Sequence, residues 1–403
     1  MANNVWVNRI NDLGEGIGGS KSLIEINPNE IIAQAKKTTG LNRFGDTLWK
    51  PYFFDYISNF NRLPRPTVLG RLLKKTELLL SLINRLLLVD QYESVPSIKN
   101  EVINNPLIIT GLPRTGTTIL FQLLSLNHDY RSPKGYEIFS PIITSKNMRT
   151  ISRERIGESM LDLTMDIVPM IQTTHDNRSD LPVECWMIYS NVLGSMLPDF
   201  YDIKSFIDNK NNTDSAYNYL WHKKVLQSLQ HDIPNKRWLL KCPSHLFYLD
   251  SLFDRYPDAK VIHMHRDPSE SIPSLLSHLQ YFQNLYQHPG KANNHINVVN
   301  FMADCLHDII YKISPSPLDN KNIINVNFND LLNDPSGTIE YIYRNIGLNY
   351  PLNMTDKINY YLEKRPRNQH GHHAYSASEF GLSNLGISEK FRFYTDYYNI
   401  PTA

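Results

Sequence analysis

The sequence predicts an α/β fold in which a central parallel sheet lies between two layers of helices. Three segments support this prediction. The apolar run 107–110 is rich in β-branched residues and precedes a glycine-containing loop and a helical pattern. Residues 236–241 and 261–265 repeat the order of strand, basic residue and helix entrance. Strands that alternate with helical segments pair in parallel, and a continuous apolar run is typical of a strand covered on both faces.

The loop after the first strand, residues 111–118, has the sequence Gly-Leu-Pro-Arg-Thr-Gly-Thr-Thr. Its spacing is that of the P-loop, G-x-x-x-x-G-K-[ST], but Thr117 replaces the lysine and Arg114 lies inside the loop. Nucleotide triphosphatases use that lysine on the β- and γ-phosphates beside magnesium, so the change disfavours Mg-ATP chemistry. The glycines and the helix N-terminus still suit a phosphate or sulfate ester, which predicts a P-loop-type fold. The alternative is a Gly-Pro loop that simply leads into a core helix.

Composition narrows the class of protein. With 403 residues, 41% of them hydrophobic, the chain can bury a large core. A net charge of +1 gives no signal for nucleic acid. Cys185, Cys242 and Cys305 are odd in number and far apart, so they predict neither a disulfide framework nor a C-x-x-C metal site. Neither a signal-peptide pattern nor an apolar run of the ~20 residues that span a bilayer is evident. We therefore expect a cytoplasmic protein without a transmembrane segment.

The chain divides into two expected regions. Residues 1–105 form a helical extension packed on the core, and residues 106–403 form the α/β domain, with a helical insertion at about 145–235. Leucines at helical spacing over residues 67–89 predict an amphipathic helix within the extension. Such a helix can lie on a membrane surface, but ordinary burial preferences favour packing on the core.

Two further strands end in basic residues, Lys241 and Arg266. The carboxyl ends of parallel strands meet at one edge of a sheet, so we expect both cations beside Arg114. Three cations and a glycine loop suit a ligand with more than one anionic group. The alternatives are that Lys241 is solvated and that Arg266 pairs with Asp267 or Asp258.

One carboxylate is expected at the same edge. Glu137 follows the first helix, where a short strand or loop would return the chain to the site; the alternative is a surface glutamate. His370, His372 and His373 lie close together in the sequence. No carboxylate or cysteine at ligand spacing accompanies them, so we expect no metal there.

Several segments in order resemble sulfotransferases that use 3′-phosphoadenosine 5′-phosphosulfate (PAPS). The resemblance is greatest to the bacterial branch, whose motifs are similar to those of tyrosylprotein sulfotransferases, and it runs from about Pro106 to the C-terminus. The segments that carry it are residues 111–118, 241–243, 261–274, 327–335 and 375–382.

The resemblance implies a role for each motif. Lys241 would neutralise charge on the bridging oxygen as it leaves, and Arg266 and Ser274 would hold the 3′-phosphate. The loop residues would hold the 5′-phosphosulfate end; they are Arg114, Thr115, Gly116, Thr117 and Thr118. Transfer would then rest on positioning and fixed cations, with no metal required.

The acceptor hydroxyl must also lose a proton. By resemblance, tyrosylprotein relatives use a glutamate shortly after the loop, which Glu137 matches, and cytosolic relatives use a histidine, for which His175 is the candidate. We favour Glu137 as the base, with His175 second or as an orienting group. Related bacterial sequences carry two acidic residues after the proline of residues 180–182. Here Val183 takes the first place and Glu184 the second, which leaves the role of Glu184 open.

The sequence therefore predicts a PAPS-dependent O-sulfotransferase that acts on a hydroxyl or phenol of a small-molecule or lipid-like acceptor. A P-loop kinase or nucleotidase is the second interpretation. It is disfavoured by Thr117 in place of the lysine, and because no strand evidently ends in an acidic residue that could bind magnesium. A non-catalytic nucleotide-binding scaffold is the third, which the presence of Lys241 together with Glu137 and His175 disfavours. The sequence predicts neither the identity of the acceptor nor the oligomeric state.

Overall fold

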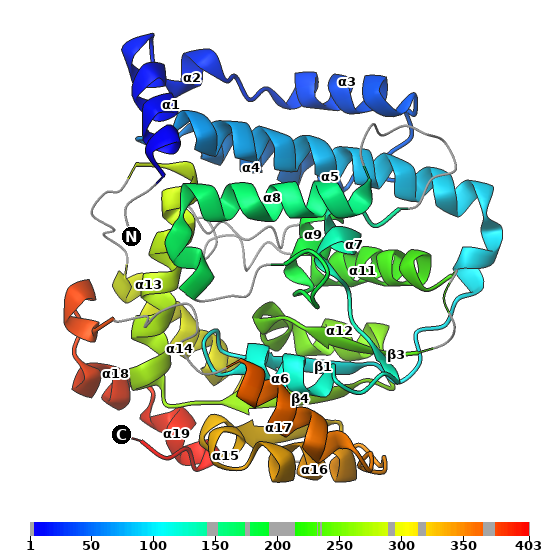
Figure 1. Ribbon diagram of the computed structural model, residues 1–403, viewed down its shortest axis with the longest axis vertical. Helices are drawn as coiled ribbons and strands as arrows, with labels where there is room; N and C mark the ends of the chain where they lie inside the picture. The colour runs from blue at the N-terminus through cyan, green and yellow to red at the C-terminus, as the bar shows by residue number, and fades with distance from the viewer. Residues whose placement is uncertain are drawn as a thin grey trace.

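The computed structural model describes residues 4–142, 152–173, 178–192, 214–231, 233, 236–288, 295–312, 320–365 and 375–402. In these ranges the centre of the α/β body is a five-stranded sheet of order β2-β3-β1-β4-β5 (Figure 1). The strands are β1 (Leu107–Gly111), β2 (Tyr130–Arg131), β3 (Arg237–Lys241), β4 (Lys260–His265) and β5 (Ile323–Asn327). Every neighbouring pair is parallel, so the predicted parallel sheet is confirmed.

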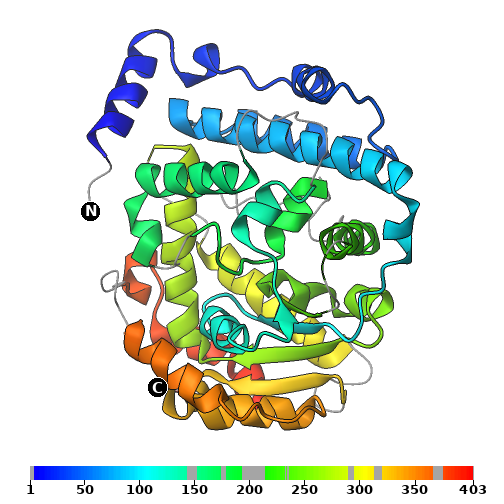
Figure 2. The ribbon, with the colours of Figure 1, turned by 45° about the vertical axis from the view of Figure 1, so that its right-hand side comes forward.

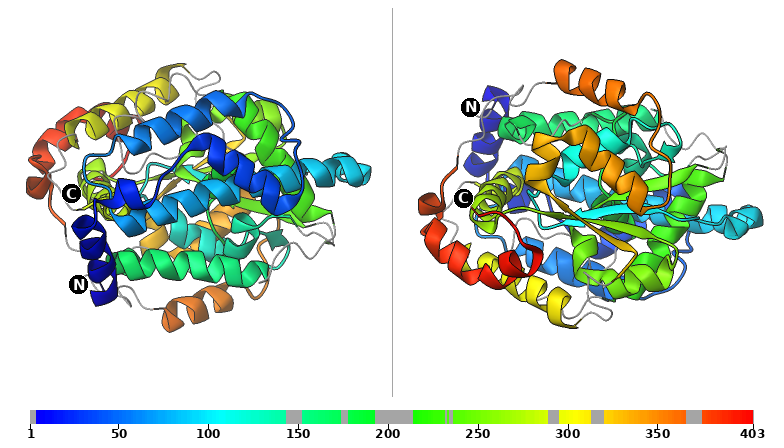
Figure 3. Two further views of the ribbon diagram at one scale, coloured as in Figure 1. Left: turned by 90° about the horizontal axis from the view of Figure 1, so that it is seen from above. Right: turned by 90° about the horizontal axis from the view of Figure 1, so that it is seen from below.

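Alternate residues along the strands face two different helical layers, as the two-residue period of a strand requires. Ile108 and Leu240 belong to a first buried cluster, and Ile109 and Leu239 belong to a second one. Helices lie on both sides of the sheet when it is seen from below (Figure 3, right). The first cluster includes residues of α11 (Ser215–Gln230), α12 (Leu249–Arg255), α13 (Pro268–Tyr286), α14 (His295–Lys312), α18 (Asn384–Lys390) and α19 (Arg392–Tyr398). The second includes residues of α6 (Thr117–Leu124), α15 (Phe328–Asn333), α16 (Pro335–Asn345) and α17 (Met354–Lys364).

The N-terminal region is helical and lies at the end of the molecule opposite the sheet (Figures 1 and 2). Its elements are α1 (Val5–Gly16), α2 (Ser20–Leu23), α3 (Pro28–Thr39), α4 (Trp49–Asn61), α5 (Val68–Ser94) and the 3₁₀ helix η1 (Pro96–Asn100). The predicted helix over residues 67–89 is α5, and the Thr67 side chain caps its first turn by accepting a hydrogen bond from the Gly70 N–H at 2.9 Å.

Helix α5 packs inside the molecule. The Arg85 side chain is fully buried and donates hydrogen bonds to the Phe44 carbonyl (2.8 Å) and the Tyr217 hydroxyl (2.9 Å). A Cβ atom at Gly70 would lie 2.5 Å from the backbone of Tyr286 in α13, so only glycine permits this approach. The contacts favour the core-packed interpretation of α5 over the membrane-surface one. None of the helices in the ranges given above is long and apolar enough to cross a membrane.

The segment between β2 and β3 supplies further helices, which lie between the N-terminal helices and the sheet (Figure 1). They are α7 (Gly135–Phe139), α8 (Arg153–Ile167), the 3₁₀ helix η2 (Pro169–Thr173), α9 (Trp186–Val192) and α11. Ahead of α9 the chain is held to the loop after β2: Pro182 forms an isolated antiparallel bridge with Lys134, and the Val183 N–H donates to the Pro133 carbonyl at 2.9 Å. This contact fixes the position of the residues that enter α9.

Candidate active site

The loop between β1 and α6 has the backbone that the glycine spacing predicts. Gly116 has a φ of +89° and Arg114 a φ of +70°, both in the left-handed region. A Cβ atom at Gly116 would lie 2.3 Å from the ring of Phe328, so glycine is required there by packing as well as by backbone conformation. The Thr115 hydroxyl donates to the Leu112 carbonyl at 2.7 Å and closes the turn. The loop therefore enters α6 in a fixed conformation.

Two of the predicted cations meet at this loop. The Arg114 guanidinium donates to the Ser274 hydroxyl at 3.1 Å, and the Arg266 guanidinium donates to the Arg114 carbonyl at 3.0 Å. Arg266 also pairs with Glu270 at 2.9 Å, one helical turn along α13, and its guanidinium lies 4.6 Å from the ring centre of Phe328. The structure thus places Arg266 beside Arg114, as the sequence predicted, and adds a contact between Arg114 and Ser274.

Burial lowers the pKa of Arg114, the neighbouring Arg266 lowers it further, and Tyr375 and Glu184 act in the opposite direction. Tyr375 is the first residue of the segment 375–382, and its interaction with Arg114 shows that this segment begins close to the loop. Because two half-buried cations repel each other, an anion bound between Arg114 and Arg266 would be stabilised by both. The electrostatics of this corner therefore favour an anionic ligand.

Lys241 is buried, with 2% of its surface exposed, so the solvated alternative is wrong. It ends β3, next to Ile109 of β1. Its ammonium group forms an ion pair with the Glu184 carboxylate and lies 3.3 Å from the Thr118 hydroxyl of the loop. An unpaired ammonium in such a place would lose several kcal/mol of hydration free energy, and Glu184 offsets that loss. Lys241 and Thr118 therefore meet at the start of α6.

Glu137 is also buried, but its carboxylate is held elsewhere. One oxygen pairs with the Arg131 guanidinium at 2.8 Å, and the other accepts a hydrogen bond from the Lys134 N–H at 3.0 Å, which caps α7. The surface alternative for Glu137 is thus wrong, and both carboxylate oxygens have partners within the segment 131–137. His175 lies outside the described residues, and so do His370, His372 and His373.

Residues 106–351 match the model of the sulfotransferase family. The chain belongs to this family. Curated relatives include the omega-hydroxy-beta-dihydromenaquinone-9 sulfotransferase Stf3 of Mycobacterium bovis and of Mycobacterium tuberculosis, each 25% identical over 259 residues. The match covers 60% of this chain and 63% of each relative, so it spans less than two thirds of their length.

Two solved structures share the fold of this chain. Sulfotransferase STF1 from Mycobacterium tuberculosis H37Rv aligns with a TM-score of 0.75 at 24% identity, over 91% of this chain and 99% of that one. Sulfotransferase STF9 from Mycobacterium avium aligns with a TM-score of 0.76 at 22% identity, over 93% of this chain and 97% of that one. The parallel sheet and the helical N-terminal region are those of a sulfotransferase fold.

Sequence reasoning missed the partner of Lys241. Glu184 comes just before α9, and its position is fixed because the next residue, Cys185, donates its N–H to the Lys241 carbonyl at 2.9 Å. The signal was present in the sequence as an acidic residue two places after Pro182. Its meaning depends on a contact across 57 residues, which local spacing does not reveal.

Proposed function

We propose that this sulfotransferase moves a sulfonate group from PAPS to a hydroxyl or phenol of a small-molecule or lipid-like acceptor. The observation that carries the proposal is the pair of bonds from Arg114 to Ser274 (3.1 Å) and from Arg266 to the Arg114 carbonyl (3.0 Å). These bonds join the glycine loop to the residue after β4 and to α13. Two anion-binding elements therefore lie side by side, which suits a donor that carries a phosphosulfate and a separate 3′-phosphate.

Each cation has a proposed role in the transfer. The loop from Arg114 to Thr118 holds the phosphosulfate, and Arg266 with Ser274 holds the 3′-phosphate. The sulfur–oxygen bond of the donor breaks, its electron pair stays on the phosphate oxygen, and the acceptor oxygen forms the new bond to sulfur. Lys241 neutralises the charge that develops on the leaving oxygen, because a fixed cation in a dry site stabilises such charge far better than water does.

For the general base we propose Glu184 in place of Glu137. Both carboxylate oxygens of Glu137 have partners in a helix cap and an ion pair, whereas the Glu184 carboxylate faces the ammonium group of Lys241. When Lys241 turns to the leaving oxygen of the donor, its ion pair with Glu184 weakens. The proton of the acceptor hydroxyl then moves from the acceptor oxygen to the Glu184 carboxylate.

For the acceptor we propose an apolar molecule that ends in a hydroxyl group. This proposal is supported by the printed name of the Stf3 relatives, whose acceptor is a hydroxylated menaquinone. It also suits a site whose carboxylate and ammonium group are largely closed to water, since the Glu184 side chain is 18% exposed and that of Lys241 is 2% exposed. An acceptor that excludes the remaining water would strengthen every charge interaction in the site.

The test is transfer of ³⁵S from labelled PAPS to four acceptors: a long-chain polyprenyl alcohol, a simple phenol, a tyrosine peptide and a monosaccharide. We expect label on the polyprenyl alcohol, with weaker transfer to the phenol. Transfer to the sugar or peptide alone would contradict the apolar acceptor but keep the sulfotransferase proposal. Transfer to none of the four by a protein that turns over ATP with magnesium would favour the kinase interpretation.

A further inference from the structure

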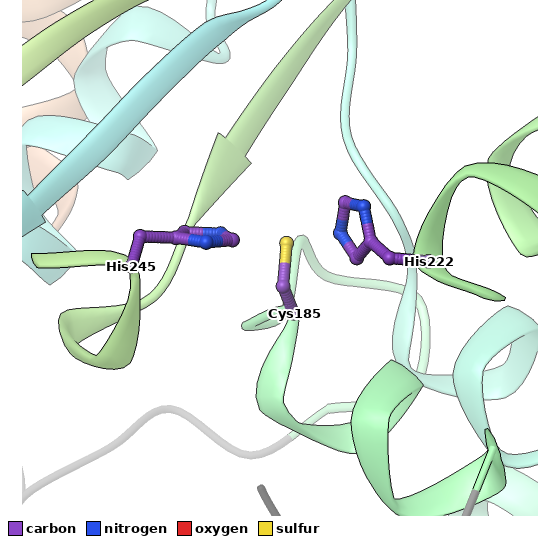
Figure 4. Close-up of side chains that lie close together, drawn as sticks. All are labelled: Cys185, His222 and His245. Atoms are coloured by element: carbon purple, nitrogen blue, oxygen red, sulfur yellow. The ribbon is translucent and has the colours of Figure 1, made fainter. Parts of the chain in front are cut away.

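A second cluster of reactive side chains lies behind the active site. Cys185, at the entrance to α9, His222 of α11 and His245 of the 3₁₀ helix η3 (Pro243–Tyr248) are fully buried. The Cys185 sulfur and one nitrogen from each imidazole all lie within 4.8 Å of one another. Figure 4 shows the sulfur between the two rings, which approach it from opposite sides. Three elements far apart in the sequence thus direct metal-binding atoms at one point.

The outer nitrogens of both rings are held by tyrosine hydroxyls. His222 Nδ1 lies 2.7 Å from the Tyr256 hydroxyl, and His245 Nδ1 lies 2.8 Å from the Tyr219 hydroxyl. The Tyr189 hydroxyl lies 3.1 Å from the same atom of His245. Such outer hydrogen bonds fix the orientation and basicity of imidazoles that bind metals.

The inner nitrogens have no protein partner. His222 Nε2 and His245 Nε2 are both buried and form no hydrogen bond. Buried polar atoms are nearly always paired, and an exception calls for an explanation such as an ion. The Cys185 sulfur lies within 4.8 Å of a nitrogen of each ring, yet neither Nε2 atom forms a hydrogen bond with it. Two buried ring nitrogens therefore lack a partner beside a single thiol.

We propose that Cys185, His222 and His245 form a binding site for a zinc-class transition-metal ion, through Sγ and the two Nε2 atoms. Binding forms one metal–sulfur and two metal–nitrogen bonds and releases the thiol proton to solvent. Zinc–ligand distances of about 2.0–2.3 Å place ligand atoms roughly 3.3–3.8 Å apart, so small side-chain rotations complete the site. Sulfur and imidazole ligands favour zinc, cobalt or copper over magnesium or calcium.

The protonation of the rings agrees with this geometry. Burial lowers the pKa of His222 and lowers the pKa of His245 to about 3. Both imidazoles are therefore neutral at pH 7, which is the form that binds a metal.

The position of the cluster suggests what the ion does. Cys185 follows Glu184, and its N–H donates to the Lys241 carbonyl at 2.9 Å. His245 lies four residues beyond Lys241, on the same turn out of β3. An ion bound here would tie together the two backbone segments that carry the ion pair of the active site. Its role is to position Glu184 and Lys241, and it makes no contact with the reacting atoms.

Metal binding is tested on the full-length protein with no activity assay, so the result does not depend on the proposed function. The purified chain is analysed for metals by mass spectrometry, stripped with a chelator and titrated with Zn²⁺ and with Co²⁺. We expect one equivalent of tightly bound metal, a rise in Tm with Zn²⁺, and the near-ultraviolet absorption of a Co²⁺–thiolate bond. A wild-type protein with no bound metal, no Tm shift and no thiolate absorption would overturn the proposal.

Variants identify the ligands. Cys185→Ser removes the thiolate and should abolish the Co²⁺–thiolate band, while Cys305→Ser alters another buried cysteine in α14 and should leave it unchanged. Tyr256→Phe keeps all three ligands but removes the hydroxyl at 2.7 Å from His222 Nδ1, so metal affinity should fall by ~10- to 100-fold. If Cys185→Ser does not fold, the Tyr256→Phe titration decides: unchanged affinity would contradict the site. A thiolate band retained in Cys185→Ser would contradict it equally.

Discussion

Replacing Glu184 with glutamine tests the proposed base. A general base contributes ~10²- to 10⁴-fold to a reaction rate, which corresponds to about 2.7–5.4 kcal/mol of activation free energy. Glu184→Gln keeps the size of the side chain but cannot accept the acceptor proton. We therefore expect kcat for ³⁵S transfer from PAPS to fall at least ~100-fold.

The same substitution leaves Lys241 buried without its carboxylate. Removing one partner of a buried ion pair costs about 3–5 kcal/mol, and we expect the lower end because the Glu184 side chain retains 18% exposure. An anionic nucleotide would offset this loss by giving Lys241 a new partner. 3′-Phosphoadenosine 5′-phosphate, the spent donor, should therefore raise the Tm of Glu184→Gln more than that of the wild type. This difference tests whether Lys241 reaches the bound donor, and the fall in kcat tests the role of Glu184 as base.

Glu137→Gln is the matched control, because it removes a buried carboxylate that pairs with Arg131. It should lower Tm while changing kcat less than ~10-fold, since a structural ion pair makes no contact with the transferred group. The opposite pattern, with a ~100-fold loss in Glu137→Gln and near wild-type turnover in Glu184→Gln, would refute our assignment and restore Glu137 as the base.

Three further predictions concern binding, the loop and pH. Arg266→Ala removes a charged hydrogen-bonding group worth about 1.5–3 kcal/mol, so titration calorimetry should show ~10- to 100-fold weaker binding of 3′-phosphoadenosine 5′-phosphate. The control is Arg344→Ala, on the exposed surface of α16, which should bind this nucleotide as the wild type does. Gly116→Ala should lower the free energy of unfolding in urea by on the order of 2 kcal/mol or more, because the added Cβ would lie 2.3 Å from the ring of Phe328. Gly347 has a φ of +71° and open space around it, so Gly347→Ala should be destabilised by backbone strain alone and therefore less. Burial lowers the pKa of His265 from 6.5 to about 4, so the fold favours the neutral imidazole. The stability that neutral His265 contributes is complete above pH 6.5. It falls as the pH drops towards 4, by up to about 1.4 kcal/mol per pH unit. The slope of unfolding free energy against pH over that window should be smaller in His265→Asn, and an equal slope would contradict the assignment.

Local signals were enough to predict the sheet and the conformation of the glycine loop. The run 107–110 is apolar and short, and Gly116 fixes the turn that follows it, so neighbours in the sequence determine β1 and the loop. The approach of Arg266 to Arg114, and of Lys241 to Thr118 in the same loop, followed from one topological rule, since parallel strands end at the same edge. The Arg114–Ser274 contact was not predicted, because only the resemblance singled out Ser274 in the helix after β4.

Contacts across long stretches of chain could not be predicted in this way. The burial of Arg85 against Tyr217 depends on how the N-terminal helices pack on α11, 132 residues away. The Glu184–Lys241 pair depends on how the chain enters α9. The cysteine count alone could not place Cys185 between His222 and His245, because three separate elements carry these residues. In each case tertiary packing, which local spacing does not encode, decides the outcome.

The most direct test of the sulfotransferase proposal is the Tm of the purified chain with the spent donor and, separately, with ATP and magnesium. A ligand at ~100 times its Kd adds about 2.7 kcal/mol of stability, which is easily measured. We predict that the spent donor alone raises Tm and that Arg266→Ala, which binds it ~10- to 100-fold more weakly, keeps only about 0.4–1.4 kcal/mol of this stabilisation at the same concentration. A shift with ATP and magnesium alone would contradict the proposal and favour a kinase.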